Sequence, residues 1–393
     1  MKEAVITGAA RTAVGSFMGG LADIPAPRLG AIAIGEAIRR SGIEKDDVEQ
    51  VIMGNVLPAG IGQAPARQAG IFAGLPPSAG ALTINKMCGS GLKAIMLAAQ
   101  SIATSEFEAV AAGGMESMSQ APYLLMKARS GYRLGNDKVY DHMIVDGLWD
   151  AYNDIHMGSC AEMLAKDQNL SRREQDEYAA SSYRRALDAI REGRFEKEIV
   201  EVPVPRKKGE PVPFRVDEEP GRGNIEKLPD LKPAFEKNGT VTAGNASTIN
   251  DGAAAVMVMS SEAAKKRGIK PLAKIVGYAT ASLEPVWFTK APIEAIRRLL
   301  ENTGVSREKV GLFEINEAFS CVALAAIRGL SLDPSRVNVN GGAVALGHPI
   351  GASGARILTT LLFAMKERGE RYGVASLCIG GGEAVAMLVE AIK

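Results

Sequence analysis

The chain reads Ala31-Ile32-Ala33-Ile34-Gly35-Glu36-Ala37-Ile38-Arg39-Arg40, which has a helical pattern, and soon afterwards Val51-Ile52-Met53-Gly54-Asn55, which is an apolar, strand-like run. Far downstream the same order returns as Ala291-Pro292-Ile293-Glu294-Ala295-Ile296-Arg297-Arg298 and Leu312-Phe313-Glu314-Ile315-Asn316. In both places a glycine and a polar link stand between the helix and the strand. A supersecondary unit that recurs in the same order indicates two duplicated halves.

Other segments repeat at nearly the same spacing. Asn55 and Asn316 are 261 residues apart, and Gly91 and Gly354 are 263 residues apart. Each half alternates helices with apolar strands, which predicts an α/β fold of largely parallel sheets covered by helices. The duplicated turns would then face one another across the junction between the halves.

The segment between the halves has a different composition. Residues 119–249 are polar, are rich in Pro and Gly near 203–233, and contain one clear helix, which starts after Ser171 and continues to about Ile190. Ser171 with Glu174 three residues later is a capping-box pattern. We therefore expect an N-terminal half at residues 1–118, completed by about 250–270, an inserted loop domain at 119–249, and a C-terminal half at 271–393.

Cys88 is the first candidate for a nucleophile. It lies in Asn85-Lys86-Met87-Cys88-Gly89-Ser90-Gly91, between the apolar run 81–84 and the helical pattern 92–102. The N-terminus of a helix presents unpaired N–H groups and a partial positive charge, and both favour a thiolate over a thiol. The competing interpretation is a small packed residue, because free Cys is among the most buried residue types.

Two further polar elements lie in glycine-rich stretches of the C-terminal third. His348 lies between Gly347 and Pro349, and the proline pushes its backbone toward an extended geometry on a loop. Cys378 ends the apolar run 373–377 and precedes three glycines, Gly380 to Gly382, whose N–H groups can approach a ligand closely. These features predict a site that stabilises an oxyanion.

These motifs resemble those of the thiolase family, and the resemblance extends over nearly the whole chain. Further matching stretches follow in the family's order, namely Gly113-Gly114-Met115-Glu116-Ser117-Met118-Ser119, His156-Met157-Gly158, Thr242-Ala243-Gly244-Asn245-Ala246-Ser247 and Asn316-Glu317-Ala318-Phe319. Several separated motifs in one order make the match specific. The resemblance is strongest to the short-chain members, and it implies duplicated αβαβα halves with an inserted loop domain that covers coenzyme A.

The resemblance implies acetyl-CoA C-acetyltransferase chemistry, a reversible Claisen condensation of two acetyl-CoA molecules to acetoacetyl-CoA and coenzyme A. Such a reaction needs an acyl carrier, a base and sites that stabilise oxyanions. By motif, Cys88 would carry the acetyl group, His348 would accept its proton, and Cys378 would move the α-proton. Asn316 would hold a water that binds the enolate oxygen together with His348. The backbone N–H groups of Cys88 and Gly380 would bind the acyl oxygen.

The resemblance also implies residues that contact the substrate. They are His156, Met157, Ala243, Ser247, Phe288, Ala318 and Phe319. Arg222 is a further candidate, because its positive charge could meet the phosphates of coenzyme A. The basic run Arg206-Lys207-Lys208 is expected either to be a solvated loop or to meet coenzyme A phosphates. The coenzyme A thioesters are substrates, and we expect neither a cofactor nor a metal. Many short-chain members have a Met-Gly pair where this chain has Phe288-Thr289, so a broader-chain degradative 3-ketoacyl-CoA thiolase stays open as the alternative.

Rival functions from other classes fit the sequence less well. Gly89-Ser90-Gly91-Leu92-Lys93-Ala94 formally matches a dinucleotide fingerprint, but no acidic residue ends a second strand about 20 residues later. That interpretation would also leave His348 and Cys378 without a role. A condensing enzyme for carrier-protein thioesters would have a second histidine where this chain has Asn316. A catalytically silent relative is disfavoured because every expected catalytic residue is present.

Composition excludes some partners. The 393 residues include 46 Lys and Arg and 45 Asp and Glu, so no global basic field suggests a nucleic acid or an anionic membrane as partner. The four cysteines suggest neither a disulfide framework nor a zinc site. No signal peptide or spanning segment is seen, so we expect a cytoplasmic protein. The family resemblance implies a homotetramer.

Overall fold

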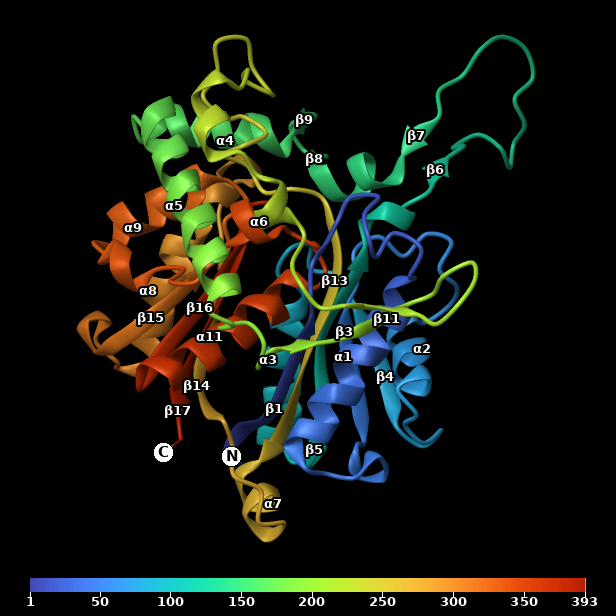
Figure 1. Cartoon of the computed structure of the whole chain (residues 1–393), viewed down its shortest axis with the longest axis vertical. Helices are drawn as coiled ribbons and strands as arrows, with labels where there is room; N and C mark the ends of the chain where they lie inside the picture. Colours follow the sequence, from blue (N-terminus) through green and yellow to red (C-terminus); the bar gives the residue numbers. More distant parts are fainter. Residues whose placement is uncertain (393) are drawn as a thin grey trace.

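The computed structural model describes residues 1–392, and its main feature is one mixed sheet (Figure 1). The strand order is β15-β16-β17-β14-β1-β13-β5-β3-β4, with β10 beside β1 and β2 beside β13. The strands of this sheet are β1 (Ala4–Thr12), β2 (Gly15–Ser16), β3 (Gln50–Gly54), β4 (Gly80–Ile84), β5 (Ala109–Ser117), β10 (Ile199–Val200), β13 (Asn250–Ser260), β14 (Ala273–Ser282), β15 (Val310–Ile315), β16 (Tyr372–Ile379) and β17 (Glu383–Ala391).

The two halves meet at the antiparallel pair of β1 and β14, where Val5 faces Lys274 and Ile6 faces Ala273. On one side the strands run β1-β13-β5-β3-β4, and on the other they run β14-β17-β16-β15. A parallel bridge from Phe313 to Val337 stands where β4 stands in the first half. From the β1–β14 pair outward, the two sides of the sheet therefore have the same arrangement of strands, which confirms the predicted duplication.

The expectation of largely parallel sheets was wrong. Only β3 with β4 and β5, β15 with β16, and the short β10 with β1 are parallel, whereas β1, β13, β14 and β17 pair antiparallel within the sheet. The reason is clearest at β16 and β17, which only Gly380 to Gly382 separate. A turn this short can join only antiparallel strands, and Gly381 and Gly382 adopt the positive φ values of 93° and 91° that it needs.

Helices form three layers around the two halves of the sheet. The helices are α1 (Ala26–Ser41), α2 (Pro65–Phe72), α3 (Ser90–Ala103), α4 (Met157–Asp167), α5 (Arg172–Arg191), α6 (Glu219–Arg222), α7 (Ser261–Lys266), α8 (Ala291–Thr303), α9 (Ser320–Leu330), α10 (Ala343–Leu346) and α11 (Ser353–Arg368). α3 and α11 share one apolar core with both halves of the sheet, α1 and α2 cover the other face of the first half, and α8 and α9 cover that of the second. This layering confirms the αβαβα expectation.

Successive strand residues point into different layers, as the two-residue period of a strand requires. Val5 packs against α1 and its neighbours, whereas Ile6 joins the central core with α3 and α11. The central helices approach closely, because a Cβ on Gly91 would lie 2.7 Å from the backbone nitrogen of Ala355. Both helices begin at the same edge of the sheet, and this edge carries the two motif turns.

The repeated helices α1 and α8 differ by about one turn in the length of helix that follows their Glu–Arg ion pair. Each ends at a left-handed glycine, Gly42 or Gly304, and each carries an ion pair between a Glu and the Arg four residues later, Glu36 with Arg40 and Glu294 with Arg298. Only Ser41 separates Arg40 from its glycine, whereas residues 299–303 separate Arg298 from Gly304. When the two Glu–Arg pairs are aligned, α8 therefore continues beyond its arginine by roughly one more turn, about 3.6 residues, than α1 does.

The segment 119–249 lies largely above the sheet in Figure 1, over the ends of α3 and α11. Its α5 has the expected capping box, with both the Ser171 and the Glu174 side-chain bonds present. It also holds three short antiparallel pairs: β6 (Tyr123–Leu124) with β7 (Tyr140–Asp141), β8 (Trp149–Asp150) with β9 (Ile155–His156), and β11 (Val202–Val204) with β12 (Val212–Phe214).

A buried ion network fastens this segment to the sheet. Arg11 of β1 donates to Glu198 at 2.5 Å and to Asp217 at 2.7 Å, and all three residues are at most 2% exposed. Beside them, β10 pairs parallel with β1, so the segment adds one short strand to the main sheet. The exact boundaries of the three predicted parts stay a prediction.

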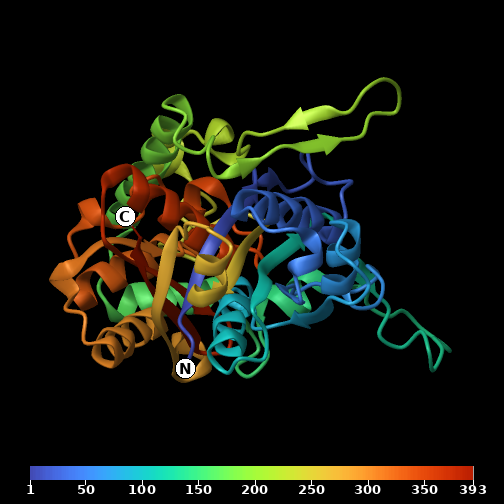
Figure 2. The same ribbon diagram turned by 90° about the horizontal axis from the view of Figure 1, so that it is seen from below.

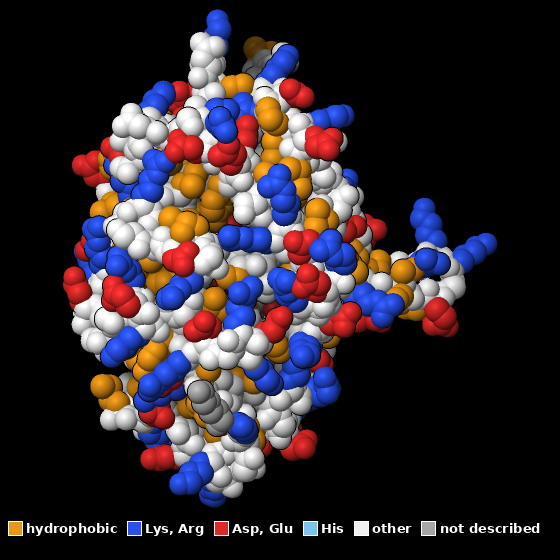
Figure 3. All heavy atoms as spheres, turned by 60° about the vertical axis from the view of Figure 1, so that its left-hand side comes forward, with side chains coloured by type: hydrophobic (Ala, Val, Ile, Leu, Met, Phe, Trp, Pro, Cys, Tyr) orange, Lys and Arg blue, Asp and Glu red, His pale blue; other side chains and the backbone are white. Residues whose placement is uncertain are grey.

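Two extensions project from the body of the molecule. The arm between β6 and β7 points away from it in Figures 1 and 2, and the β11–β12 hairpin is seen along the upper edge of Figure 2. The surface in Figure 3 shows Lys and Arg side chains interspersed with Asp and Glu, without a large field of one sign on that face. Within residues 1–392, no helix combines the length and the apolarity that a membrane span requires.

Candidate active site

Cys88 lies in a tight turn immediately before α3, as its sequence position predicted. Met87 adopts a positive φ of 46°, and the hydroxyl of Ser90 accepts from the Lys86 N–H at 2.8 Å and donates to the Met87 carbonyl at 2.6 Å. Lys86 also forms a 2.7 Å ion pair with Glu383, which follows the glycine turn after Cys378. The turn that carries the thiol of one half is thereby tied to the glycine turn of the other.

Cys88 opens into a pocket of about 260 Å³ that both halves and the inserted segment build. Cys88 comes from the first half, whereas His348, Ile350 and Gly380 come from the second. The pocket is mainly apolar, and its lining consists of Cys88, Met118, Ile144, Gly147, Leu148, His156, Met157, Phe235, Ala246, Ser247, Thr248, Ile249, Phe288, Ala318, Phe319, His348, Ile350 and Gly380. Neither half forms this site alone.

His348 is held on its loop by two hydrogen bonds. Its backbone N–H donates to the Asn250 side chain at 2.8 Å, and its Nδ1 lies 2.6 Å from the hydroxyl of Ser353. That hydroxyl donates its single proton to the carbonyl oxygen of Pro349 at 2.9 Å, so it accepts from Nδ1–H. The network therefore assigns the proton of the neutral ring to Nδ1 and leaves Nε2 free as a proton acceptor.

The pKa values of His348 and Cys88 are both shifted from their ordinary values. Burial, followed by the positive charge of Arg356, lowers the pKa of His348 to about 3. Burial raises the pKa of Cys88 to about 11, although the N–H groups of Gly380 and of Cys88 itself oppose the rise. The N–H groups at this turn thus favour the thiolate, as expected, but the loss of hydration on burial outweighs them. At neutral pH the pair is a thiol and a neutral imidazole.

Cys378 and Asn316 lie directly behind the pocket wall. Cys378 is fully buried near the end of β16, in one apolar cluster with Met157, Phe288 and Phe319. Burial raises the pKa of the Cys378 thiol well above its usual value, and the neighbouring thiols of Cys88 and Cys321 add to the rise. The remaining two cysteines, Cys160 and Cys321, are buried as packing residues.

Asn316 follows β15 and approaches the catalytic loop. Its Nδ2 lies 3.5 Å from Nε2 of His348, the nitrogen without a proton. Its Oδ1 is buried and has no hydrogen-bond partner among the described residues. A buried carbonyl oxygen without a partner is costly, so this atom is a suitable place for a bound water.

Most of the predicted substrate residues line the pocket, and two do not. His156, Met157, Ser247, Phe288, Ala318 and Phe319 are in the lining. His156 also caps α4 by accepting the Gly158 N–H at 3.0 Å, and burial lowers its pKa. Ala243 and Arg222 are exposed and lie outside the lining.

Sequence reasoning missed several residues of the site. Phe235 stacks on His156 with ring centroids 4.8 Å apart and meets Phe319 edge-on at 6.1 Å. No motif marks Phe235, which lies in the irregular part of the inserted segment. Asn250 and Ser353 were also missed, although Ser353 closes the glycine-rich stretch of His348 and Asn250 follows the Thr242 to Ser247 motif.

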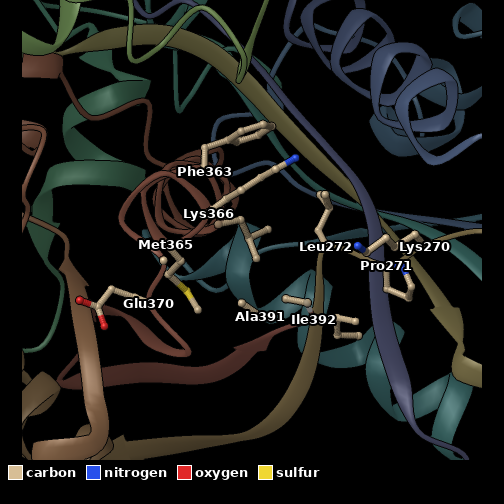
Figure 4. A pocket seen from close by; sticks show the side chains of 12 residues that line it. Lys270, Pro271, Leu272, Phe363, Met365, Lys366, Glu370, Ala391 and Ile392 are labelled. Atoms are coloured by element: carbon tan, nitrogen blue, oxygen red, sulfur yellow. The ribbon is translucent and has the colours of Figure 1, made fainter.

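A second hollow lies elsewhere and contains none of the predicted residues. It measures about 390 Å³ and lies between residues 270–273, the C-terminal end of α11 and the last strand (Figure 4). Leu272, Met365 and Ile392 contribute apolar side chains, and Lys270 and Lys366 stand at its edge. Within residues 1–392, no group of three or more His, Cys, Asp or Glu side chains is arranged to hold a metal ion.

Comparison with known proteins gives the family. The family model described as "Thiolase, N-terminal domain" matches residues 4–262, and that described as "Thiolase, C-terminal domain" matches residues 269–391. The chain belongs to the thiolase family. It is 54% identical to the acetyl-CoA acetyltransferase of Pseudomonas aeruginosa over 98% of this chain and 99% of that protein.

Two solved structures are closely similar. The acetyl-CoA acetyltransferase of Bacillus anthracis has a TM-score of 0.98 at 43% identity, covering 100% of this chain and 99% of that one. The Acat5 thiolase of Ascaris suum in complex with coenzyme A has a TM-score of 0.95 at 46% identity, covering 100% of both chains. These likenesses confirm the family resemblance that the motifs indicated.

Proposed function

We propose that this protein is an acetyl-CoA acetyltransferase, which interconverts two acetyl-CoA molecules with acetoacetyl-CoA and coenzyme A. One observation carries the proposal: Cys88, His348 and the Gly380 N–H line one pocket, with Cys378 and Asn316 directly behind it. Two of the relatives named above, those of Pseudomonas aeruginosa and Bacillus anthracis, are named acetyl-CoA acetyltransferases, and they are 54% and 43% identical to this chain over nearly its whole length. Their names favour the short-chain interpretation over the broader-chain degradative alternative.

In the cleavage direction the reaction begins at Cys88. Nε2 of His348 takes the thiol proton, and the new thiolate attacks the 3-oxo carbon of acetoacetyl-CoA. The N–H groups of Cys88 and Gly380 are placed to bind the oxyanion that forms on this carbon. The hydrogen bond between Nδ1–H of His348 and the Ser353 hydroxyl leaves Nε2 without a proton, so the acceptor is in place for the thiol.

Carbon–carbon cleavage then needs a proton donor. As the bond breaks, acetyl-CoA leaves as its enolate, which takes the proton of the Cys378 thiol, and Cys88 stays acetylated. The enolate oxygen is bound by protonated His348 and by a water on Asn316. Incoming coenzyme A gives its thiol proton to Cys378 and attacks the acetyl group, and Cys88 regains its proton from His348. Synthesis is the reverse of these steps.

The substrate is held partly outside the acyl pocket. The acetyl or acetoacetyl group fits the apolar pocket of about 260 Å³, and the inserted segment above it would cover the coenzyme A moiety. The exposed Ala243 and Arg222 would then contact coenzyme A beyond the pocket. The complex of the Ascaris suum thiolase with coenzyme A supports this ligand class. The predicted cytoplasmic location stays a prediction.

Chain length tests the short-chain proposal. Phe288 is 2% exposed and lines the pocket, so its ring should collide with longer acyl chains. A methylene contributes only about 0.8 kcal/mol of attraction, and exclusion must therefore come from steric overlap. We expect kcat/KM for coenzyme A-dependent cleavage to fall steeply from acetoacetyl-CoA to 3-oxohexanoyl-CoA and longer substrates, and Phe288→Ala to reduce the difference. Similar kcat/KM values for four- and eight-carbon substrates would establish the degradative alternative instead.

The arm between β6 and β7 supports the predicted homotetramer. Tyr123, Met126 and Val139 are at least half exposed on it, and Leu134 is fully exposed. Apolar side chains on a projecting arm are typical of a surface that a second copy of the chain covers. We expect sedimentation to give a tetramer for the wild type and smaller species for Leu134→Asp together with Met126→Asp. A monomeric wild type at micromolar concentration would contradict the proposal.

A further inference from the structure

The duplication gives the active site a counterpart on the other side of the junction. Gly54 faces Gly114 in the β3–β5 pair, and Ile315 faces Ser376 in the β15–β16 pair. Asn55 and Asn316 each lie one residue beyond these pairs, at the ends of β3 and β15. Glu116 lies two residues after Gly114, and Cys378 lies two residues after Ser376. Glu116 therefore occupies in the first half the position that Cys378 occupies in the second half.

The helix ends complete the correspondence. α3 begins at Ser90 and α11 begins at Ser353, so Cys88 and Gly351 each lie two residues before the helix. The counterpart of Cys88, Cys378 and Asn316 is therefore the set Gly351, Glu116 and Asn55. In this set the nucleophile is replaced by a glycine, and the acid–base thiol is replaced by a carboxylate.

The Glu116 carboxylate fills this second place. It is completely buried, and each of its oxygens accepts two hydrogen bonds. Oε1 accepts from Asn55 Nδ2 at 2.6 Å and from the Leu57 N–H at 3.1 Å. Oε2 accepts from the Val56 N–H at 2.9 Å and from the Gly351 N–H at 2.8 Å.

No substrate fits in the counterpart site. A Cβ on Gly351 would lie 2.5 Å from Oε2 of Glu116, and a Cβ on Gly114 would overlap the Gly351 carbonyl oxygen. In the active site the Gly380 N–H faces the sulfur of Cys88, whereas here the Gly351 N–H is already bound by the carboxylate. Burial raises the pKa of Glu116 to about 7, but all four groups that contact its oxygens are N–H donors, so the protein's own carboxyl group fills this second place and has a structural task.

That task concerns the loop of His348. Gly351 comes three residues after His348, and Ile350 between them lines the pocket. Asn250 holds the backbone of His348, Ser353 holds its ring, and Glu116 holds the far end of the loop at Gly351. Because Glu116 also binds Val56 and Leu57, it fixes the loop of the second half to the end of β3 in the first half.

We propose that Glu116 is a positioning residue, which sets the placement of His348 against Cys88 by anchoring Gly351 from the opposite half. The expected loss in kcat rests on the proposed function, whereas the expected change in the alkylation rate of Cys88 does not. Misplacement of a catalytic group by about 1 Å can cost about 100-fold in rate. A loss of this size in kcat is the expected signature.

Glu116→Gln is an informative change because it keeps the shape and removes acceptors. A glutamine has one oxygen and one NH₂ group, so in either orientation two of the four N–H donors would face another donor. Glu116→Gln should lower kcat by about 10- to 100-fold and leave KM for acetyl-CoA nearly unchanged. Alkylation of Cys88 by iodoacetamide should slow as well, because His348 accepts its proton less readily.

Asp217→Asn is the matched control. Asp217 is also a buried carboxylate that accepts a backbone N–H, that of Val14 at 2.7 Å, but it lies outside the pocket lining. It should lower thermal stability while its folded fraction keeps the wild-type alkylation rate and kcat. Asn55→Ala removes one donor to Glu116 and provides a milder variant if Glu116→Gln does not fold.

The outcomes separate this inference from the proposed function. Wild-type kcat and Cys88 alkylation in folded Glu116→Gln would overturn the positioning role, and so would equal losses in Asp217→Asn. If Glu116→Gln does not fold, wild-type values in Asn55→Ala overturn it, and a fall in both quantities supports it. A wild type without thiolase activity would refute the proposed function, whereas the alkylation rates would still test Glu116.

Discussion

Replacing Cys378 with alanine should slow the formation of acetoacetyl-CoA by orders of magnitude while Cys88 still accepts an acetyl group from acetyl-CoA. The two half-reactions differ in their leaving groups. Coenzyme A leaves as a thiolate, which is stable enough to depart with little help, whereas an enolate forms only if the α-proton is moved. General acid–base groups contribute about 10²- to 10⁴-fold, and we expect the loss in condensation to lie in this range.

Peptide mass analysis after incubation with acetyl-CoA measures the first half-reaction, and acetoacetyl-CoA formation measures the whole. Cys88→Ala should lose both. Cys321→Ala is the matched control, because Cys321 is equally buried near Cys378 and donates only a weak bond to the Ala161 carbonyl at 3.7 Å. It should keep both activities. Full synthesis by Cys378→Ala, or an acetyl group found only on Cys378, would reverse the assignment of the two thiols.

His348→Asn should slow both half-reactions, because the ring both accepts the Cys88 proton and binds an oxyanion. Removal of one oxyanion donor typically costs about 2.7 to 4 kcal/mol, or 10²- to 10³-fold in rate, and loss of the proton acceptor adds to it. Single-turnover acetylation of Cys88 and steady-state condensation should therefore fall together. Wild-type alkylation of Cys88 by iodoacetamide in this variant would show that His348 does not accept its proton.

The same variant has an expected effect on acid stability. An unfolded His348 takes up a proton as the pH falls below its ordinary pKa of 6.5, whereas the buried side chain stays neutral down to about pH 3. The unfolded state binds more protons in this interval, so His348 makes the fold less stable as the pH falls through it. His348→Asn should remove this part of the acid lability. Urea unfolding at pH 7 and pH 5 would show it as a smaller difference between the two pH values.

Some features of the site followed from local sequence. The placement of Cys88 before α3 depended on a short turn with Gly89 and Ser90, and that of His348 on a loop between Gly347 and Pro349. Backbone preferences of glycine and proline act over a few residues, so these turns are readable in the chain. The duplication was readable as well, because both halves keep the same order of elements.

The sequence by itself therefore determined the duplicated α/β architecture, the two motif turns and the capping of α5, since each depends on residues close together in the chain or on a repeated pattern. The tertiary structure alone decided the antiparallel pairing of β13 and β17, the neutral states of Cys88 and His348, and the places of Phe235, Asn250 and Glu116. The physical reason is that strand partners, hydration and hydrogen bonds across the junction depend on which distant segments meet, and no local preference encodes those meetings.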